Sequence, residues 1–309
     1  IIGLSILSYF FVEKIFRSRN ILSLKQFIII IISLFIITSI SSTFIIFGKG
    51  YKDRFFHTKN FQLDNKHYLK ERVKYLEKNT DSKINIFNKF DKKNILIVGN
   101  SHADDTFNIF YNYGNLFNNL NFAISSLQID CFFEFIDQKK TKCTKQKNNN
   151  VSKNFKNSHT IILSTLWHEQ DLESLDQSIK NLLKLNKKII IMSKSPTFKW
   201  RNKYTMLDLF VLKNKRMPNS IEEKLLSKKL FEKIEKKTFI INDKLKLISK
   251  RNDITFLDKM DYVCNIKAKA CDILTNNKEK IFFDNSHYTL AGADHFREKI
   301  YLKEWFRFY

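Results

Sequence analysis

A serine in a short turn between two regular segments is the first group in the chain that could do chemistry. The apolar run 95–98 is followed by Gly99, and Ser101 comes two residues later, just before a helical pattern that begins at Ala103. A strand, a tight turn and a helix in this order expose a hydroxyl at the carboxyl edge of a parallel sheet. Backbone N–H groups at the start of the helix can stabilise a developing oxyanion. We interpret Ser101 as a candidate nucleophile, with a helix cap as the simpler alternative.

A candidate base for this serine lies near the other end of the chain. Asp284 and His287 are three residues apart, in a turn that follows the apolar residues 281–283. An alcohol near neutral pH needs an adjacent base, imidazole titrates in the right range, and a carboxylate can orient the ring. Taken singly, Asp284 could be an ordinary turn residue and His287 a surface histidine. Together with Ser101 they predict a Ser–His–Asp triad.

The segments between these motifs indicate how they are positioned. Short apolar runs alternate with helical patterns from residue 94 onward. Such alternation predicts a parallel sheet covered on both faces, and its order suits a three-layer α/β/α, flavodoxin-like domain. Functional residues of this fold lie at the carboxyl ends of strands, where Ser101 and Trp167 are expected. The expected strands span 94–98, 120–125, 159–165, 188–193 and 253–257, and the expected helices 103–113, 170–185, 204–213, 220–236, 239–250 and 289–306.

The amino-terminal part of the chain predicts a membrane anchor. Residues 27–47 are uncharged and long enough to cross a bilayer, which takes about 20 residues. A buried soluble helix and a signal peptide are the alternatives. Residues 1–12 suggest the end of another span, cut by the start of the sequence, and the basic loop over 13–25 should be cytoplasmic. Everything after residue 47 is then expected outside the cytoplasm, beginning with a linker over 48–92 that contains an amphipathic helix.

The net charge of +23 raises the question of a nucleic-acid partner. The lysines are scattered along the whole chain, and no zinc-finger, helix-turn-helix or RNA-binding motif accompanies them. We therefore expect no nucleic acid, and favour a membrane surface or an acidic glycan as partner. We also expect no metal, because Asp104 and Asp105 suit the first turn of a helix. Six glycines in all argue against a nucleotide cradle.

Three short motifs resemble those of a known family. Residues 99–102, GNSH, resemble block I of the SGNH (GDSL-type) hydrolase superfamily, and residues 284–287, DNSH, resemble its terminal Asp-x-x-His block. The stretch 7–17, LSYFFVEKIFR, is similar to the end of the last conserved helix of the acyltransferase 3 membrane domain. Membrane helices followed by an SGNH domain are the architecture of fused acyltransferase 3–SGNH proteins. The resemblance implies that the chain is the carboxyl-terminal part of a longer protein.

The resemblance also implies roles for the matching residues. Ser101 corresponds to the nucleophile, His287 to the base and Asp284 to the orienting acid, while the Ser101 N–H would be one oxyanion donor. The remaining oxyanion and pocket positions would be Gly99, Asn100, His102 and Trp167, with a core aromatic as the alternative for Trp167. Asn100 stands where the family commonly has Asp. Phe16 stands where the membrane motif usually has Pro, and separate Gly and Asn oxyanion blocks are not evident.

The cysteines fit a location outside the cytoplasm. Their spacings match neither a zinc ribbon nor a C-x-x-C motif. Disulfides would each close and stabilise a loop in an oxidising compartment. Of the three possible connectivities we choose Cys131–Cys143 and Cys264–Cys271.

The function implied by the resemblance is O-acylation of a cell-surface polysaccharide, most simply O-acetylation. The acceptor would be a sugar hydroxyl of a polysaccharide or lipid-linked glycan. The donor would be acyl-CoA such as acetyl-CoA, through the upstream membrane domain, with no cofactor bound here. A periplasmic SGNH esterase or deacetylase and a non-catalytic glycan-binding domain are the alternatives. The expected organisation is the end of the acyltransferase 3 domain and a loop over 1–26, a span over 27–47, a linker over 48–92 and the SGNH-like domain over 93–309, in the inner membrane with the last domain periplasmic.

Overall fold

The computed structural model describes residues 9, 13–14, 23–47, 61–63, 65–79, 87, 93–111, 120–127, 129–136, 149–200 and 204–302. The chain divides into two compact units, Ile1–Lys59 and Asn60–Tyr309. Apart from Tyr9, the expected partial span over 1–12 lies outside the described residues, as does most of the loop before residue 23.

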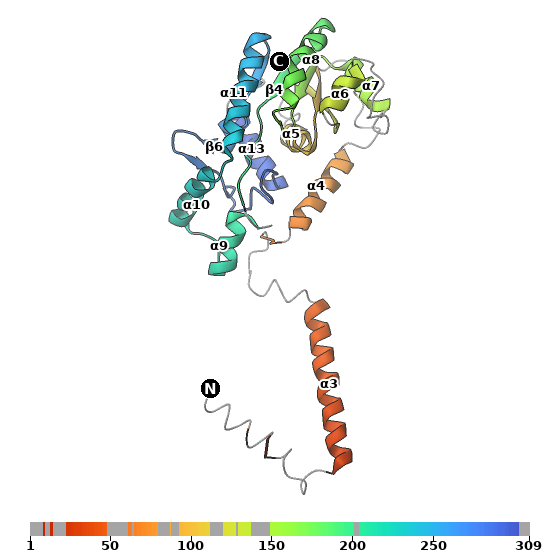
Figure 1. Cartoon of the computed structure of the whole chain (residues 1–309), viewed down its shortest axis with the longest axis vertical. Coiled ribbons are helices and arrows are strands. Elements are labelled where there is room, and N and C mark those ends of the chain that lie inside the picture. The colour runs from red at the N-terminus through yellow and green to blue at the C-terminus, as the bar shows by residue number, and fades with distance from the viewer. Residues whose placement is uncertain are drawn as a thin grey trace. The chain divides into compact units, whose positions relative to one another are not determined.

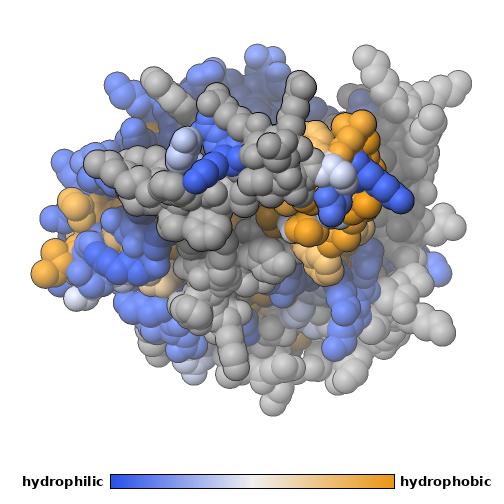
Figure 2. All heavy atoms as spheres, turned by 90° about the horizontal axis from the view of Figure 1, so that it is seen from below, coloured by the Kyte–Doolittle hydropathy of each residue, from blue (hydrophilic) through white to orange (hydrophobic). Residues whose placement is uncertain are grey.

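The first unit contains helix α3, Leu24–Phe47, which is long and apolar enough to cross a membrane and has no buried residue (Figure 1). It begins three residues before the expected start, because Ser23 and Gln26 form a reciprocal cap. The Ser23 Oγ accepts from the Gln26 N–H, and the Gln26 Oε1 accepts from the Ser23 N–H. The hydroxyls of Thr38 and Ser41 donate to carbonyls one turn earlier, so they are satisfied inside the helix. The larger orange patch of Figure 2 lies where this helix is seen from below.

The second unit is built on a five-stranded parallel sheet in the order β2-β1-β3-β4-β5. This order confirms the flavodoxin-like, three-layer fold predicted from the sequence. Each strand is within two residues of its expected bounds, and β1 is buried beyond its first residue. The strands are β1 Lys93–Val98, β2 Leu120–Ser125, β3 Thr160–Leu163, β4 Lys188–Met192 and β5 Thr255–Leu257.

Helices cover both faces of this sheet. Apolar residues of α6, α8 and α11 share one core cluster with alternate residues of the strands, such as Leu96, Ile161 and Ile189. Helix α5 packs on β2 and against α13, away from that cluster. The helices of this unit are α4 Asn65–Asn79, α5 Ser101–Tyr111, α6 Ile129–Ile136, α7 Asn149–Asn157, α8 Asp171–Lys184, α9 Met206–Asn214, α10 Ser220–Glu232, α11 Lys236–Arg251, α12 Met260–Val263 and α13 Leu290–Leu302.

Several local expectations need correction. The expected helices do not include 149–157, yet α7 forms there, and its buried Asn154 accepts from the Phe87 N–H. The expected helix 220–236 ends at Glu232, because Ile234 pairs with Phe198 as a β-bridge. Helix α4, which covers the amphipathic helix expected within 48–92, falls in the compact unit that begins at Asn60.

A short hairpin, β6 Cys264–Asn265 and β7 Ala270–Cys271, was not predicted. The disulfide Cys264–Cys271 joins its strands, with Cα atoms 3.9 Å apart, as the chosen connectivity required. Cys131 is also disulfide-bonded, but Cys143 lies outside the described residues.

Candidate active site

The turn after β1 lies where the sheet order reverses, between β1 and β3. Gly99 has φ +151°, and a Cβ on it would come within 1.9 Å of the Ser164 carbonyl oxygen. Only glycine therefore allows the turn to pass so close to the end of β3. In open α/β sheets this reversal point is where ligands bind, at the carboxyl ends of the strands.

Asn100 caps helix α5 and leaves Ser101 free for other contacts. The Asn100 Oδ1 accepts from the backbone N–H of His102 at 3.1 Å and of Leu166 at 3.2 Å, tying the turn to the segment after β3. An aspartate could accept both bonds, so the change from the family's Asp keeps these contacts. Ser101 is the first residue of α5, two residues earlier than the expected start of the helix at Ala103. The alternative of Ser101 as the cap does not hold.

The structure brings Ser101, His287 and Asp284 together across 186 residues of sequence. The Ser101 Oγ lies 2.8 Å from His287 Nε2, and His287 Nδ1 lies 2.8 Å from Asp284 Oδ2. The other oxygen of Asp284 accepts from the backbone N–H of Ser286 at 2.9 Å and of His287 at 2.8 Å. These distances are those of a nucleophile, a base and an orienting acid in hydrogen-bond contact.

The surroundings favour a charged carboxylate and a basic imidazole. Burial opposes ionisation of Asp284, but the hydrogen bond from His287 and those from the backbone outweigh it and hold the pKa of Asp284 below its usual range. Burial also opposes protonation of His287, yet the hydrogen bond to Asp284 and the charges of Asp105 and Asp284 raise the pKa of His287. His287 is therefore equipped to accept a proton from Ser101.

His102 lies beside this chain of hydrogen bonds. Its ring stacks on that of His287, with centroids 4.7 Å apart and planes at 19°. The side chain is fully buried, and burial together with the charge of Lys259 holds the pKa of His102 well below its usual range. His102 is thus a neutral ring beside the triad.

Trp167 does not line an accessible pocket. Its side chain is fully buried in the core cluster, and its Nε1 donates to the Met192 carbonyl at 2.8 Å. This is the core position given above as the alternative. His168, next along the chain, is exposed.

The sequence did not indicate a group of buried charges behind the triad. Arg72 of α4 donates to the Ser101 carbonyl and lies 3.1 Å from Asp105. Lys259 donates to the Ser164 Oγ at 2.9 Å. Ser101, His102 and Asp105 could be placed on one helix face by their spacing, but no local pattern connects Arg72 or Lys259 to them.

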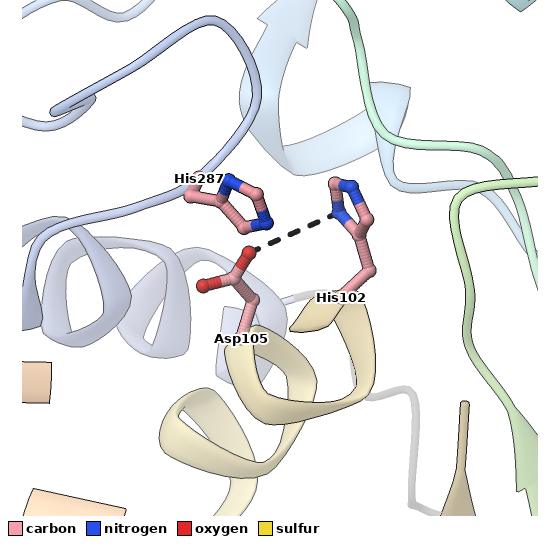
Figure 3. A group of neighbouring side chains, drawn as sticks. All are labelled: His102, Asp105 and His287. Atoms are coloured by element: carbon pink, nitrogen blue, oxygen red, sulfur yellow. Dashed lines mark ion pairs between the residues drawn. The ribbon is translucent and has the colours of Figure 1, made fainter. Parts of the chain in front are cut away.

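A cation site at this place is disfavoured by its surroundings. His102, Asp105 and His287 each have a ligand atom within 4.8 Å of the others (Figure 3). Both ring nitrogens of His287, however, already contact Ser101 and Asp284. The positive side chain of Arg72 also lies against Asp105. The cluster therefore suits a histidine base better than a metal ion.

Comparisons with known proteins bear on the family and the fold of this chain. Residues 67–301 match the family model described as "SGNH domain (fused to AT3 domains)". No curated protein sequence matches the chain.

Two solved structures are among those similar to this chain. The periplasmic domain of a lipopolysaccharide acetyltransferase from Salmonella ser. Paratyphi A is 18% identical, with a TM-score of 0.56, and the match covers 76% of this chain and 96% of that one. An acetyl xylan esterase is 10% identical, with a TM-score of 0.37 over 68% of this chain and 99% of that one. The first of these shows a shared fold. Because the family model spans most of the chain, the chain belongs to the family of SGNH domains that are fused to AT3 domains.

Proposed function

We propose that this chain is the acyl-transferring part of a membrane-anchored O-acyltransferase. The observation that carries the proposal is the unbroken contact from Ser101 through His287 to Asp284, placed at the reversal point of the sheet. Membership in a family fused to AT3 domains supports acyl transfer as the reaction class.

The proposed reaction has two steps with balanced proton movements. In the first, His287 Nε2 takes the Ser101 proton as Oγ attacks the acyl carbonyl, and then gives that proton to the departing donor group. In the second, His287 takes the proton of a sugar hydroxyl, which attacks the acyl-serine, and Ser101 regains a proton as it leaves. Asp284 stabilises the imidazolium in both steps. The Ser101 N–H, at the start of α5, would face the oxyanion.

The acceptor and the location are inferred from further observations. The similar Salmonella domain is described as periplasmic and as part of a lipopolysaccharide acetyltransferase, which supports a surface polysaccharide as acceptor. Helix α3 would anchor the chain in the inner membrane, and the Cys264–Cys271 disulfide suits an oxidising compartment outside the cytoplasm. Acetyl-CoA would supply the acyl group through the membrane domain, and nothing in the reaction above requires a cofactor or metal in this chain.

A single serine substitution tests the proposal. Ser101→Ala in the whole protein should abolish acylation of the cell-surface glycan, measured by mass spectrometry of purified polysaccharide, while the protein remains folded and in the membrane. Ser174→Ala, an exposed serine of α8, serves as the matched control and should acylate normally. Unchanged acylation in Ser101→Ala would refute the assignment.

A second measurement separates transfer from hydrolysis. The purified protein is incubated with an acyl donor and polysaccharide, and acyl-glycan is compared with free acid. Mainly acyl-glycan supports the transferase, whereas free acid alone would show an esterase. Labelling of Ser101 by a serine-directed fluorophosphonate that is lost in His287→Ala excludes a purely glycan-binding role, and absence of labelling in the unaltered protein would favour it.

A further inference from the structure

A buried charged pair stands beside His287 and takes no part in the proposed reaction. Arg72 and Asp105 are 3% and 1% exposed, and Arg72 Nη2 lies 3.1 Å from Asp105 Oδ1. Arg72 also donates to the backbone carbonyl of Ser101. The pair therefore connects α4 directly to the turn that carries the candidate nucleophile.

The Asp105 carboxylate is left without hydrogen bonds in the part of the chain that the structure describes. Its Oδ2 lies 3.9 Å from His102 Nδ1, and one of its oxygens lies within 4.8 Å of a ring nitrogen of His287 (Figure 3). A buried carboxylate without hydrogen bonds is costly to a folded protein. Its position facing two imidazole rings indicates that its charge acts on them.

The two rings respond differently to this charge. Both nitrogens of His102 lack hydrogen bonds among the described residues, and its burial keeps the ring neutral. A neutral ring stacked on His287 can accommodate an imidazolium there, whereas a second positive ring would repel it. The proton is therefore directed to His287.

We propose that Asp105 and Arg72 are positioning residues that set, through opposed charges, how readily His287 takes up the Ser101 proton. Asp105 stabilises the imidazolium from the side of α5, while Asp284 does so by direct hydrogen bond. Arg72 limits this effect and holds Asp105 in an ion pair, so that Asp105 does not displace Asp284 as the partner of His287. This inference rests on the proposed role of His287 as the base.

The charged groups around the two rings come from several elements. Asp284 belongs to the same turn as His287, Asp105 and Asp104 to α5, and Arg72 to α4. Lys259, before α12, and Lys194, after β4, are the nearby lysines whose charges act on His102. Lys259 contacts Ser164 rather than either histidine, so we expect it to act on both rings only through its charge.

The test uses substitutions that change charge at nearly constant shape. The full chain in detergent is labelled with a fluorophosphonate across pH 4–9, and the titration of His287 is followed separately by NMR of ¹³C-labelled histidine, assigned with His287→Gln. Asp105→Asn should move the His287 titration and the acid limb of labelling to lower pH by about one unit, a tenfold change in proton affinity. Arg72→Gln should move both to higher pH. Arg72→Gln/Asp105→Asn should return them close to the original value.

Further variants guard against effects on folding. Arg72→Lys keeps the charge and should leave the titration within a few tenths of a unit, and Asp104→Asn, at the neighbouring position, is the matched control and should behave likewise. Shifts of both single variants in the same direction, or no shift in either, would overturn the inference. If the unaltered protein is not labelled, but Asp105→Asn and Arg72→Gln still move the His287 titration in opposite directions, the proposed function is refuted. The proposed effect of the two charges on His287 is then still supported.

Discussion

Two buried ion pairs lie at helix α4, and they differ in how their carboxylates are hydrogen-bonded. At the site, Arg72 faces Asp105, whose oxygens accept no hydrogen bond among the described residues. Away from the site, Lys280 donates to both oxygens of Asp208 at 2.7 and 2.8 Å, and Asp208 Oδ2 also accepts from the N–H and hydroxyl of Thr205 at 2.8 Å each. Both pairs are almost completely buried.

The difference separates a structural pair from one that acts on its neighbours. Asp208 and Thr205 also form the reciprocal cap of α9, and Lys280 lies 5.2 Å from the Tyr68 ring of α4, so every charge there is paired within the fold. Asp105 is opposed by the Arg72 charge but accepts no hydrogen bond among the described residues, so its charge can still act on the neighbouring histidines. Unsatisfied buried groups of this kind are expected where function, rather than stability, determines the residue.

The largest expected effect is a loss of protein stability when the hydrogen-bonded Asp208–Lys280 pair is broken. Asp208→Asn leaves Lys280 buried with one oxygen in place of two, and breaking a buried pair in this way costs about 3–5 kcal/mol. Chemical unfolding of the purified protein, followed by tryptophan fluorescence, measures the loss. The pH dependence of Ser101 labelling in the folded fraction should stay unchanged. A loss below about 1 kcal/mol would remove the distinction between the two pairs.

Lys259 is buried and makes no salt bridge within the described part of the chain. Removing its charge should therefore stabilise the protein, whereas removing a charge of the Asp208–Lys280 pair should destabilise it. Burial lowers the pKa of Lys259 to about 7, below the value of about 10.4 of an unfolded lysine. Between these values the unfolded state binds more protons, so the free energy of unfolding should rise with pH. Lys259→Met should flatten this rise.

The size of the Lys259 effect can be measured directly. We expect Lys259→Met to be more stable than the unaltered protein at pH 6 by about 2 kcal/mol, with the gain disappearing toward pH 10, in unfolding curves collected at several pH values. Lys280→Met should instead destabilise the protein at every pH, because it strands Asp208. Equal behaviour of the two methionine variants would contradict the comparison.

Asp105→Asn should cost less than either change at the structural pair. The amide loses the ion pair with Arg72 but no hydrogen bond, and it avoids the burial of a carboxylate. Arg72 stays buried but keeps the Ser101 carbonyl as an acceptor. We expect the free energy of unfolding to fall by about 1 kcal/mol or less, while the pH dependence of labelling shifts. A loss as large as that of Asp208→Asn would mean that Asp105 is a structural residue.

The features of the fold and the site that could be predicted from the sequence are those that a local sequence pattern indicates. The strands and the pairing of Ser101 with Asp284 and His287 follow from contiguous patterns: an apolar run, a glycine, a hydroxyl, and an aspartate three residues before a histidine. The depth of Trp167 could not be predicted, because an aromatic after a strand packs equally well in a pocket or a core. Helix α7 was missed because its asparagines favour loops, while Phe155 is packed against the core only in the fold.

Contacts between residues far apart in the sequence could not be predicted, because no local pattern indicates them. Arg72 is one of many basic residues in a chain with net charge +23, and nothing in its own segment distinguishes it from the lysines around it. Its contact with Ser101 and Asp105 forms when α4 packs against α13 and brings Arg72 beside α5, and no local sequence pattern predicts that packing. Buried charge is visible only once the elements are assembled.

The smallest expected effect is that of Asp104→Asn, which serves as a comparison for Asp105→Asn. Asp104 is the adjacent carboxylate, 3.7 Å from Arg72, but it is partly exposed and accepts from the Ser126 hydroxyl at 2.8 Å. Asp104→Asn removes a negative charge from the first turn of α5, which is worth about 0.3–1 kcal/mol through the helix dipole. Solvent screens its charge from His287, so the acid limb of Ser101 labelling should remain in place. A shift of that limb as large as the shift in Asp105→Asn would show that any negative charge near Arg72 acts on His287. The position of Asp105 facing the two histidines would then not explain its effect.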